Sequence, residues 1–185
     1  MDILLHRANS ISEINMDIGL EIDVRDYRNE LVLSHDPSTG SEEMLNDYLK
    51  NVRSNQLLAV NVKSSEIENQ LKLCLENNKI KNYFTFDWSV PSLIKALNIK
   101  LSCAFRLSEY EQFIFNNCSW VWIDSFHSIW YDEKLLDMLH EKNIKIALVS
   151  PEIHGRSKEL KKIQEYVNIG LVDAICTDLP EYYQK

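Results

Sequence analysis

Residues 20–37 read LEIDVRDYRNELVLSHDP, and this stretch indicates the fold. Apolar and ionisable side chains alternate over Leu20–Arg25, which is the pattern of a strand with two different faces. Tyr27-Arg28-Asn29 suits a tight turn, and Glu30–His35 is a second strand-like run. The stretch therefore predicts a strand with a hairpin partner attached to its end.

Short β-rich runs alternate with amphipathic segments along the rest of the chain. Eight strands are predicted, at Ile3–Arg7, Leu20–Arg25, Leu57–Lys63, Tyr83–Asp87, Leu101–Arg106, Trp120–Asp124, Ile144–Val149 and Asp173–Thr177. Helices are predicted at Met44–Val52, Glu66–Asn77, Ser89–Leu97, Ser108–Phe115, Asp132–His140 and Ser157–Val167. Strands that alternate with helices favour parallel βαβ units, and eight such units close into a TIM-type barrel.

The predicted fold class is therefore α/β, a compact (β/α)8 TIM-type barrel with a β-hairpin extension after the second strand, as one domain over residues 1–185. With 185 residues against about 250 in a typical barrel of this kind, its loops are expected to be short. An open doubly wound sheet is the alternative. The first strand–helix junction, residues 6–10, carries no Gly-rich phosphate loop, which disfavours that alternative.

Charge and hydropathy exclude several classes of partner. The net charge of −8 disfavours nucleic acid, because no surplus of Lys and Arg exists to replace counterions on its phosphates. No stretch reaches the length of a membrane-spanning helix, and residues 1–6 lack a signal-peptide pattern. We therefore expect a cytoplasmic protein with a small-molecule partner.

Glu21 and Asp23 form the sharpest local signal. Residues two apart on a strand point to the same face, so both carboxylates project together. Two adjacent carboxylates repel unless a cation lies between them or one takes a proton. Mg²⁺ or Ca²⁺, which prefer oxygen ligands, suit such a pair. The alternative is an edge strand whose acidic residues face water.

Other polar residues also fall where the predicted strands end, which is where a TIM-type barrel places its chemistry. His6 and His35 each follow a strand and together offer a general acid and a general base. Arg7 and Lys63 offer positive charge for a phosphate group. Taken singly, each histidine could be a core residue and each cation a surface residue.

Later strand ends supply four more candidates. Asn61 and Asp87 are candidate metal ligands, and Arg106 is a candidate phosphate-binding residue. His154 follows the seventh predicted strand and could line the substrate pocket. His127 and His140 are predicted to be structural or exposed to solvent.

These motifs resemble those of the glycerophosphodiester phosphodiesterases, within the phospholipase-C-like phosphodiesterase barrels. His6-Arg7-Ala8 is similar to the family's His-Arg-Gly, and residues 21–24 match its Glu-x-Asp-Val. His35-Asp36 matches the His-Asp that the hairpin delivers. Residues 61–63 stand where the family has Glu-x-Lys, and residues 173–180 resemble its last strand, which ends in Thr-Asp-x-Pro.

The resemblance implies a divalent metal, Mg²⁺ or Ca²⁺, held by Glu21, Asp23 and the third-strand residue, here Asn61. It implies proton transfer by His6 and His35, with Arg7 and Lys63 on the phosphate. Ala8 replaces the family's glycine, which alters loop freedom but removes no chemical group. Asn61 replaces an acidic ligand, and Asp87 could compensate for the lost charge.

The predicted function is metal-dependent hydrolysis of a glycerophosphodiester or a related small phosphodiester. Two alternatives keep the same phosphate site: a lyase that stops at a cyclic phosphate, and a catalytically degenerate protein that only binds phosphate esters. A third is a structural barrel whose polar mouth has no specific role.

Overall fold

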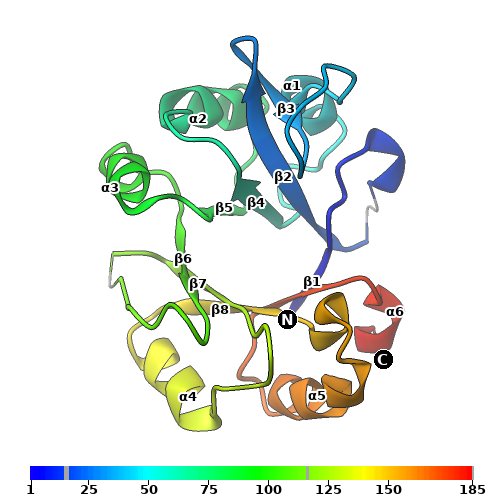
Figure 1. Ribbon diagram of the computed structural model, residues 1–185, viewed down its shortest axis with the longest axis vertical. Helices are drawn as coiled ribbons and strands as arrows, with labels where there is room; N and C mark the ends of the chain where they lie inside the picture. Colours follow the sequence, from blue (N-terminus) through cyan, green and yellow to red (C-terminus); the bar gives the residue numbers. More distant parts are fainter. Residues whose placement is uncertain (15–16, 116, 185) are drawn as a thin grey trace.

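The computed structural model describes residues 1–14, 17–115 and 117–184. Eight parallel strands form a nearly closed barrel: β1 (Asp2–Leu5), β2 (Gly19–Tyr27), β4 (Leu58–Val62), β5 (Tyr83–Phe86), β6 (Ala104–Leu107), β7 (Trp120–Ile123), β8 (Lys145–Val149) and β9 (Ala174–Thr177). Their order around the barrel is β5-β4-β2-β1-β9-β8-β7-β6, so neighbours in sequence are neighbours in space (Figure 1). A single parallel bridge between Thr85 and Cys103 joins the two ends of this order. The predicted barrel is confirmed, and the open doubly wound sheet is excluded.

The predicted hairpin is also confirmed. Strand β3 (Glu30–Leu33) pairs antiparallel with β2, with Leu33 opposite Val24. Arg28 and Asn29 form the turn with φ of 49° and 68°, the left-handed conformation that a two-residue hairpin turn requires. Because β2 is nine residues long, it extends beyond the barrel and carries β3 with it (Figure 1).

Helices cover the outside of the barrel. They are α1 (Leu45–Leu49), α2 (Glu68–Asn77), α3 (Val90–Asn98), α4 (Glu133–Glu141), α5 (Leu160–Asn168) and α6 (Pro180–Tyr183), with 3-10 turns at Ile11–Glu13, Pro151–His154 and Ser157–Glu159. Asp132 caps α4 by accepting a hydrogen bond from the backbone N–H of Leu135. Among the described residues, no helix combines the length and apolar character needed to cross a bilayer.

The predicted helix at Ser108–Phe115 is wrong. The Ser108 hydroxyl accepts hydrogen bonds from the backbone N–H groups of residues 110 and 111, which competes with helical pairing. The Glu109 carboxylate accepts hydrogen bonds from the backbone N–H groups of residues 126–128. These contacts tie the segment to the loop after β7, and it runs irregularly between α3 and α4 (Figure 1).

Two apolar layers hold the barrel together. Outward-facing residues of the strands, such as Ile22 of β2, pack against the helices. Inside the barrel, Phe84 stacks on Trp120 and Phe86 stacks on Trp122, with ring centroids 4.6 and 4.0 Å apart. These aromatic rings fill the interior, so the polar residues at the carboxyl ends of the strands lie above a packed floor.

Candidate active site

The carboxyl ends of the barrel strands surround a pocket of about 320 Å³. Nine of the ten predicted site residues line it: His6, Arg7, Glu21, His35, Asn61, Lys63, Asp87, Arg106 and His154. The tenth, Asp23, is 1% exposed and is therefore buried below the surface of the pocket. The structure thus brings residues from six strand ends and the hairpin into one region.

The register of β2 and β4 places three oxygen-bearing side chains together. Glu21 and Asp23 point into the barrel because they alternate with Leu20, Ile22 and Val24, which pack outward in the helix-facing core. Both carboxylates are 1% exposed, so an edge strand with its acidic residues in water is excluded. Across the sheet, Asp23 lies beside Asn61, which is also buried.

The charges and hydrogen-bond acceptors of the buried Glu21, Asp23 and Asn61 side chains are only partly compensated by their neighbours. Burial, and then the nearby Asp23, raise the pKa of Glu21 above its ordinary value. The Oδ1 atoms of Asp23 and Asn61 are buried and accept no hydrogen bond from the described residues, although Lys63 Nζ lies 3.3 Å from Asp23 Oδ1. Buried polar atoms are normally paired. A divalent cation bound by oxygen ligands would satisfy these atoms, so the residues fit the predicted metal.

The donor set differs from a three-carboxylate site, because the third oxygen belongs to an amide. Among the described residues, no group of three or more His, Cys, Asp or Glu side chains has an arrangement that could hold a metal. Asn61 is outside those residue types, and an amide oxygen can still coordinate Mg²⁺ or Ca²⁺. Metal binding by Glu21, Asp23, Asn61 and Asp87 stays a prediction.

The loop after β1 is held tightly against the carboxylates. Arg7 has a φ of 51°, and its backbone N–H donates to Glu21 Oε2 over 2.8 Å. The Asn9 side chain donates to Asp23 Oδ2 and accepts from the backbone N–H of Asp23. The buried Tyr48 hydroxyl donates to the Ala8 carbonyl. This loop therefore orients Arg7 and Asp23 at the same time.

Each of the two predicted catalytic histidines is oriented by an aspartate. His6 Nδ1 lies 2.9 Å from Asp178 Oδ1, and His35 Nδ1 lies 2.9 Å from Asp36 Oδ1. A carboxylate at Nδ1 favours the tautomer that carries its proton there and leaves Nε2 as a proton acceptor. In His35 that acceptor receives a hydrogen bond from Arg7 Nη2 over 2.7 Å.

Arg106 is at the centre of an ion-pair network on the opposite wall. It donates to both carboxylate oxygens of Asp87 and to Asp124, whose other oxygen contacts His154 Nε2 at 2.7 Å. Burial lowers the pKa of the guanidinium, but the ion pairs with Asp87 and Asp124 outweigh it and raise the pKa above its ordinary value. Arg106 therefore stays charged, and Asp87 would have to release it to bind a metal.

Sequence reasoning missed several residues that position this site. Asn9 follows no strand pattern, and its contact with Asp23 depends on the loop after β1. Glu152 accepts hydrogen bonds from the Ser150 and Thr177 hydroxyls and from the backbone N–H of Asp178, the partner of His6. Both Glu152 and Asp178 lie at strand ends, and Asp178 also belongs to the Thr-Asp-x-Pro motif, but neither signal predicted their hydrogen-bond partners.

Outside this pocket, His127 contacts the Tyr110 hydroxyl and His140 contacts Asp173 Oδ2 at 2.9 Å. Neither histidine lines the candidate pocket.

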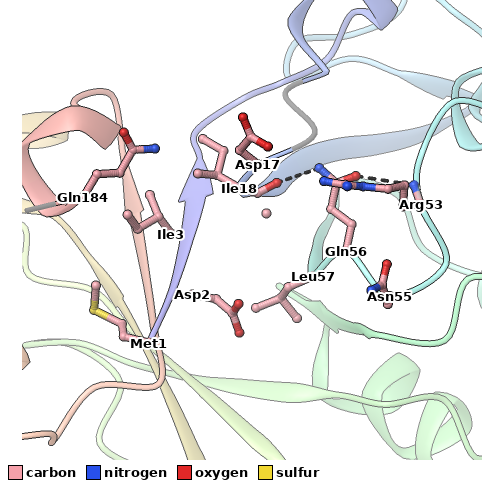
Figure 2. Close-up of a pocket in the computed structure, with 11 residues that line it drawn as sticks. Met1, Asp2, Ile3, Asp17, Ile18, Arg53, Asn55, Gln56, Leu57 and Gln184 are labelled. Atoms are coloured by element: carbon pink, nitrogen blue, oxygen red, sulfur yellow. Dashed lines mark hydrogen bonds between the residues drawn. The ribbon is translucent and has the colours of Figure 1, made fainter.

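A second pocket, of about 330 Å³, opens at the amino ends of β1, β2 and β4 (Figure 2). Its polar side chains join the loops: Gln56 donates to the Ile18 carbonyl over 2.6 Å and its side-chain oxygen accepts from the Arg53 backbone (Figure 2). Active sites of TIM-type barrels lie at the carboxyl ends of the strands. The pocket around His6 and Glu21 is therefore the candidate active site.

No family model and no curated protein sequence match this chain. Solved structures do. A glycerophosphodiester phosphodiesterase from Agrobacterium tumefaciens is 13% identical in sequence, with a TM-score of 0.73, and the match covers 99% of this chain and 97% of that one. A glycerophosphodiester phosphodiesterase from Thermotoga maritima is 17% identical, with a TM-score of 0.69, over 99% of this chain and 96% of its own. An Oleispira antarctica phosphodiesterase, in complex with the product sn-glycerol-3-phosphate, is 14% identical over 100% of this chain and 95% of its own, with a TM-score of 0.73. The chain therefore has the barrel fold of the glycerophosphodiester phosphodiesterases.

Proposed function

We propose that this protein is a metal-dependent phosphodiesterase that hydrolyses a glycerophosphodiester or a related small phosphodiester, with His6 and His35 as the acid–base pair. The observation that carries the proposal is the composition of one pocket. It combines two histidines paired with aspartates, the cations Arg7 and Lys63 beside them, and a buried oxygen-ligand group. Such a combination suits phosphoryl transfer, in which charge on the phosphate must be balanced and two protons must move.

The two cations would hold the phosphate. Arg7 offers a planar guanidinium that can donate two parallel hydrogen bonds, and Lys63 offers an ammonium point charge. Arg7 is engaged with His35, and Lys63 with Asp23. A bound phosphate is expected to draw both cations toward its non-bridging oxygens. In doing so it releases His35 Nε2 for proton transfer.

A metal held by Glu21, Asp23 and Asn61 would add positive charge beside the phosphate, which stabilises the negative charge of the transition state. The chain's own residues perform the proton transfers. One imidazole removes the proton of the attacking hydroxyl as the new P–O bond forms. The other donates a proton to the oxygen of the departing alcohol as the old P–O bond breaks. Asp178 and Asp36 stabilise whichever imidazole becomes charged.

The attacking hydroxyl can come from water or from the substrate itself. A glycerol hydroxyl next to the phosphate would give a cyclic phosphate, which water then opens. A lyase would stop at the cyclic product. Phosphorus NMR of the products separates these routes, because a cyclic five-membered phosphate has its own resonance.

A binding-only protein is favoured by one specific observation, the amide at position 61. With Asn61 the site has one negative charge fewer than a three-carboxylate site, which weakens metal binding. Such a protein would bind glycerol phosphate, the compound found in the Oleispira antarctica structure, without turning over a diester.

The deciding experiment measures hydrolysis of bis(p-nitrophenyl) phosphate and glycerophosphocholine with Mg²⁺, Ca²⁺, Mn²⁺ or a chelator. His6→Ala and His35→Ala are the test variants. His140→Ala, which removes a histidine–aspartate contact elsewhere, is the matched control. The proposal expects metal-dependent turnover that both test variants lose and the control keeps. Glycerol phosphate binding without turnover under every condition would instead establish the binding-only protein.

A further inference from the structure

The irregular segment at residues 108–115 borders a groove on the outside of the barrel rim. This rim groove lies between α3 and the segment after β6, and its volume is about 440 Å³. Seven of its lining residues are largely apolar: Trp88, Val90, Leu93, Ala104, Phe105, Phe113 and Phe115. The groove is therefore larger than the candidate active site beside it, whose volume is about 320 Å³.

The rim groove and the candidate active site are adjacent. Asp87, Arg106 and Glu111 line both cavities. Arg106 forms an ion pair with Asp87 and lies 3.9 Å from Glu111, so these three side chains form a polar ridge between the two cavities. A molecule whose phosphate lies near His6 would have to cross only this ridge to reach the groove.

Apolar side chains around the groove are unusually exposed. Val90 is 54% exposed, and Phe113 and Tyr110 are each 70% exposed. Tyr110 also packs against Phe126, which lines the active-site pocket, with ring centroids 6.1 Å apart. Apolar side chains that gather in the open beside a binding pocket indicate a surface that becomes covered by a ligand.

We propose that the rim groove binds the apolar part of an amphiphilic phosphodiester, in which a short polar linker joins the phosphate to one acyl, alkyl or aryl group. This inference rests on the proposed function and specifies its substrate class. The linker would cross the polar ridge, where the carboxylates of Asp87 and Glu111 can accept hydrogen bonds from its hydroxyl groups. The apolar group would then lie against Val90 and Phe113.

Continuity with the active site favours a substrate group over a protein partner. Glu111 and Arg106 belong to both cavities, so a group bound in the groove lies next to the candidate active site, as the apolar part of a substrate held there would. The volume suits a single chain or ring. Covering this apolar surface would strengthen binding by about tenfold or more, at the usual free energy per unit of buried apolar area.

The test compares glycerophosphocholine with the same diester carrying one medium-length acyl chain on glycerol, below the concentration at which it forms micelles. The wild type is expected to favour the acylated substrate by about tenfold or more in kcat/KM, mainly through a lower KM. Val90→Ser and Phe113→Ser should reduce this preference. Ile169→Ser is the matched control, because Ile169 is an exposed apolar residue, at 56%, that lines neither cavity.

Equal kcat/KM values for the two substrates, or an equal loss of preference in Ile169→Ser, would overturn the inference. A dimer that dissociates in Phe113→Ser would also overturn it, because the groove would then hold a second copy of the chain.

Failure of the proposed function is detected separately. If neither diester is hydrolysed, titration of the wild type with monomeric dodecylphosphocholine, followed by NMR, still tests the groove. Resonance shifts at Val90 that are reduced in the Phe113→Ser variant would support an apolar subsite in a binding protein. Shifts that are absent, or spread over the whole surface, would reject the groove as a binding site.

Discussion

Arg7 Nη2 lies 2.7 Å from Nε2 of His35, so one predicted phosphate-binding group donates a hydrogen bond to the reactive nitrogen of a predicted acid–base group. The contact is possible because Arg7 adopts a left-handed backbone conformation after β1, while the β2–β3 hairpin delivers His35. Both side chains reach the pocket, yet neither can act while they are paired. Their separation is a step that a bound phosphate would drive.

We predict that inorganic phosphate or glycerol phosphate changes the ¹⁵N chemical shift of His35 Nε2 in the wild type, because the guanidinium leaves the ring. In Arg7→Met the shift should already be near its ligand-bound value, and KM should rise by about tenfold or more with the loss of a charge-assisted contact. A His35 resonance that is insensitive to phosphate in the wild type would contradict this role for Arg7.

We predict that Asp178→Asn lowers kcat by about tenfold to a thousandfold, because His6 loses the carboxylate that orients its ring and stabilises its charged form. Asp173→Asn is the matched control, since Asp173 contacts His140 outside the pocket. Steady-state kinetics over a range of pH is the measurement. A structural role for Asp178 would leave the pH profile unchanged and lower only the amount of folded protein.

We predict that Asn61→Asp strengthens the binding of Mg²⁺ or Ca²⁺, because a carboxylate replaces a neutral amide beside Asp23. Asn61→Leu should abolish it. Isothermal titration calorimetry measures the affinity directly, and the rise in melting temperature with added metal provides a second readout. If Asn61→Asp binds no more metal than the wild type, then Glu21, Asp23 and residue 61 do not form a metal site.

We predict that Arg106→Met destabilises the fold by about 3–5 kcal/mol, because it leaves Asp87 and Asp124 as partly buried carboxylates without their cation. Urea unfolding measures this loss. Arg106→Lys should recover only part of it, since an ammonium cannot reproduce the paired contact with Asp87. If Arg106→Met loses activity while its free energy of unfolding stays unchanged, Arg106 acts on the phosphate instead.

We predict that Glu109 contributes to stability in a pH-dependent way. Although burial raises the pKa of Glu109, hydrogen bonds from the backbone N–H groups of residues 126–128 outweigh it and lower the pKa to about 2. Because the folded-state pKa lies below the unfolded one, the contribution is fully present above the ordinary pKa of a glutamate and is lost as pH falls toward 2. Unfolding midpoints of Glu109→Gln and the wild type should therefore converge in acid, whereas the exposed-site control Glu181→Gln should differ little at any pH.

The barrel, the hairpin and most of the candidate site residues could be predicted from the amino-acid sequence. Strand periodicity is local information, so the alternation around Ile22 identified β2 and put Glu21 and Asp23 on one face. Eight strands that mostly alternate with helices implied parallel pairing, which brings all the carboxyl ends to one rim. That geometry alone placed His6, Lys63 and the other strand-end candidates near one pocket.

The contacts among these residues could not be predicted in the same way, because contacts between side chains depend on strand register and on the paths of the loops. The pairing of Arg7 with His35, and of Arg106 with Asp87, could not be read from spacing, since each joins two different strand ends. The backbone of the segment after β6 could not be predicted from the sequence either. Its apolar residues recur at helical spacing, but the Ser108 and Glu109 hydrogen bonds favour a different backbone. Non-local hydrogen bonds overrode local propensity there, and the resulting irregular segment lines the rim groove.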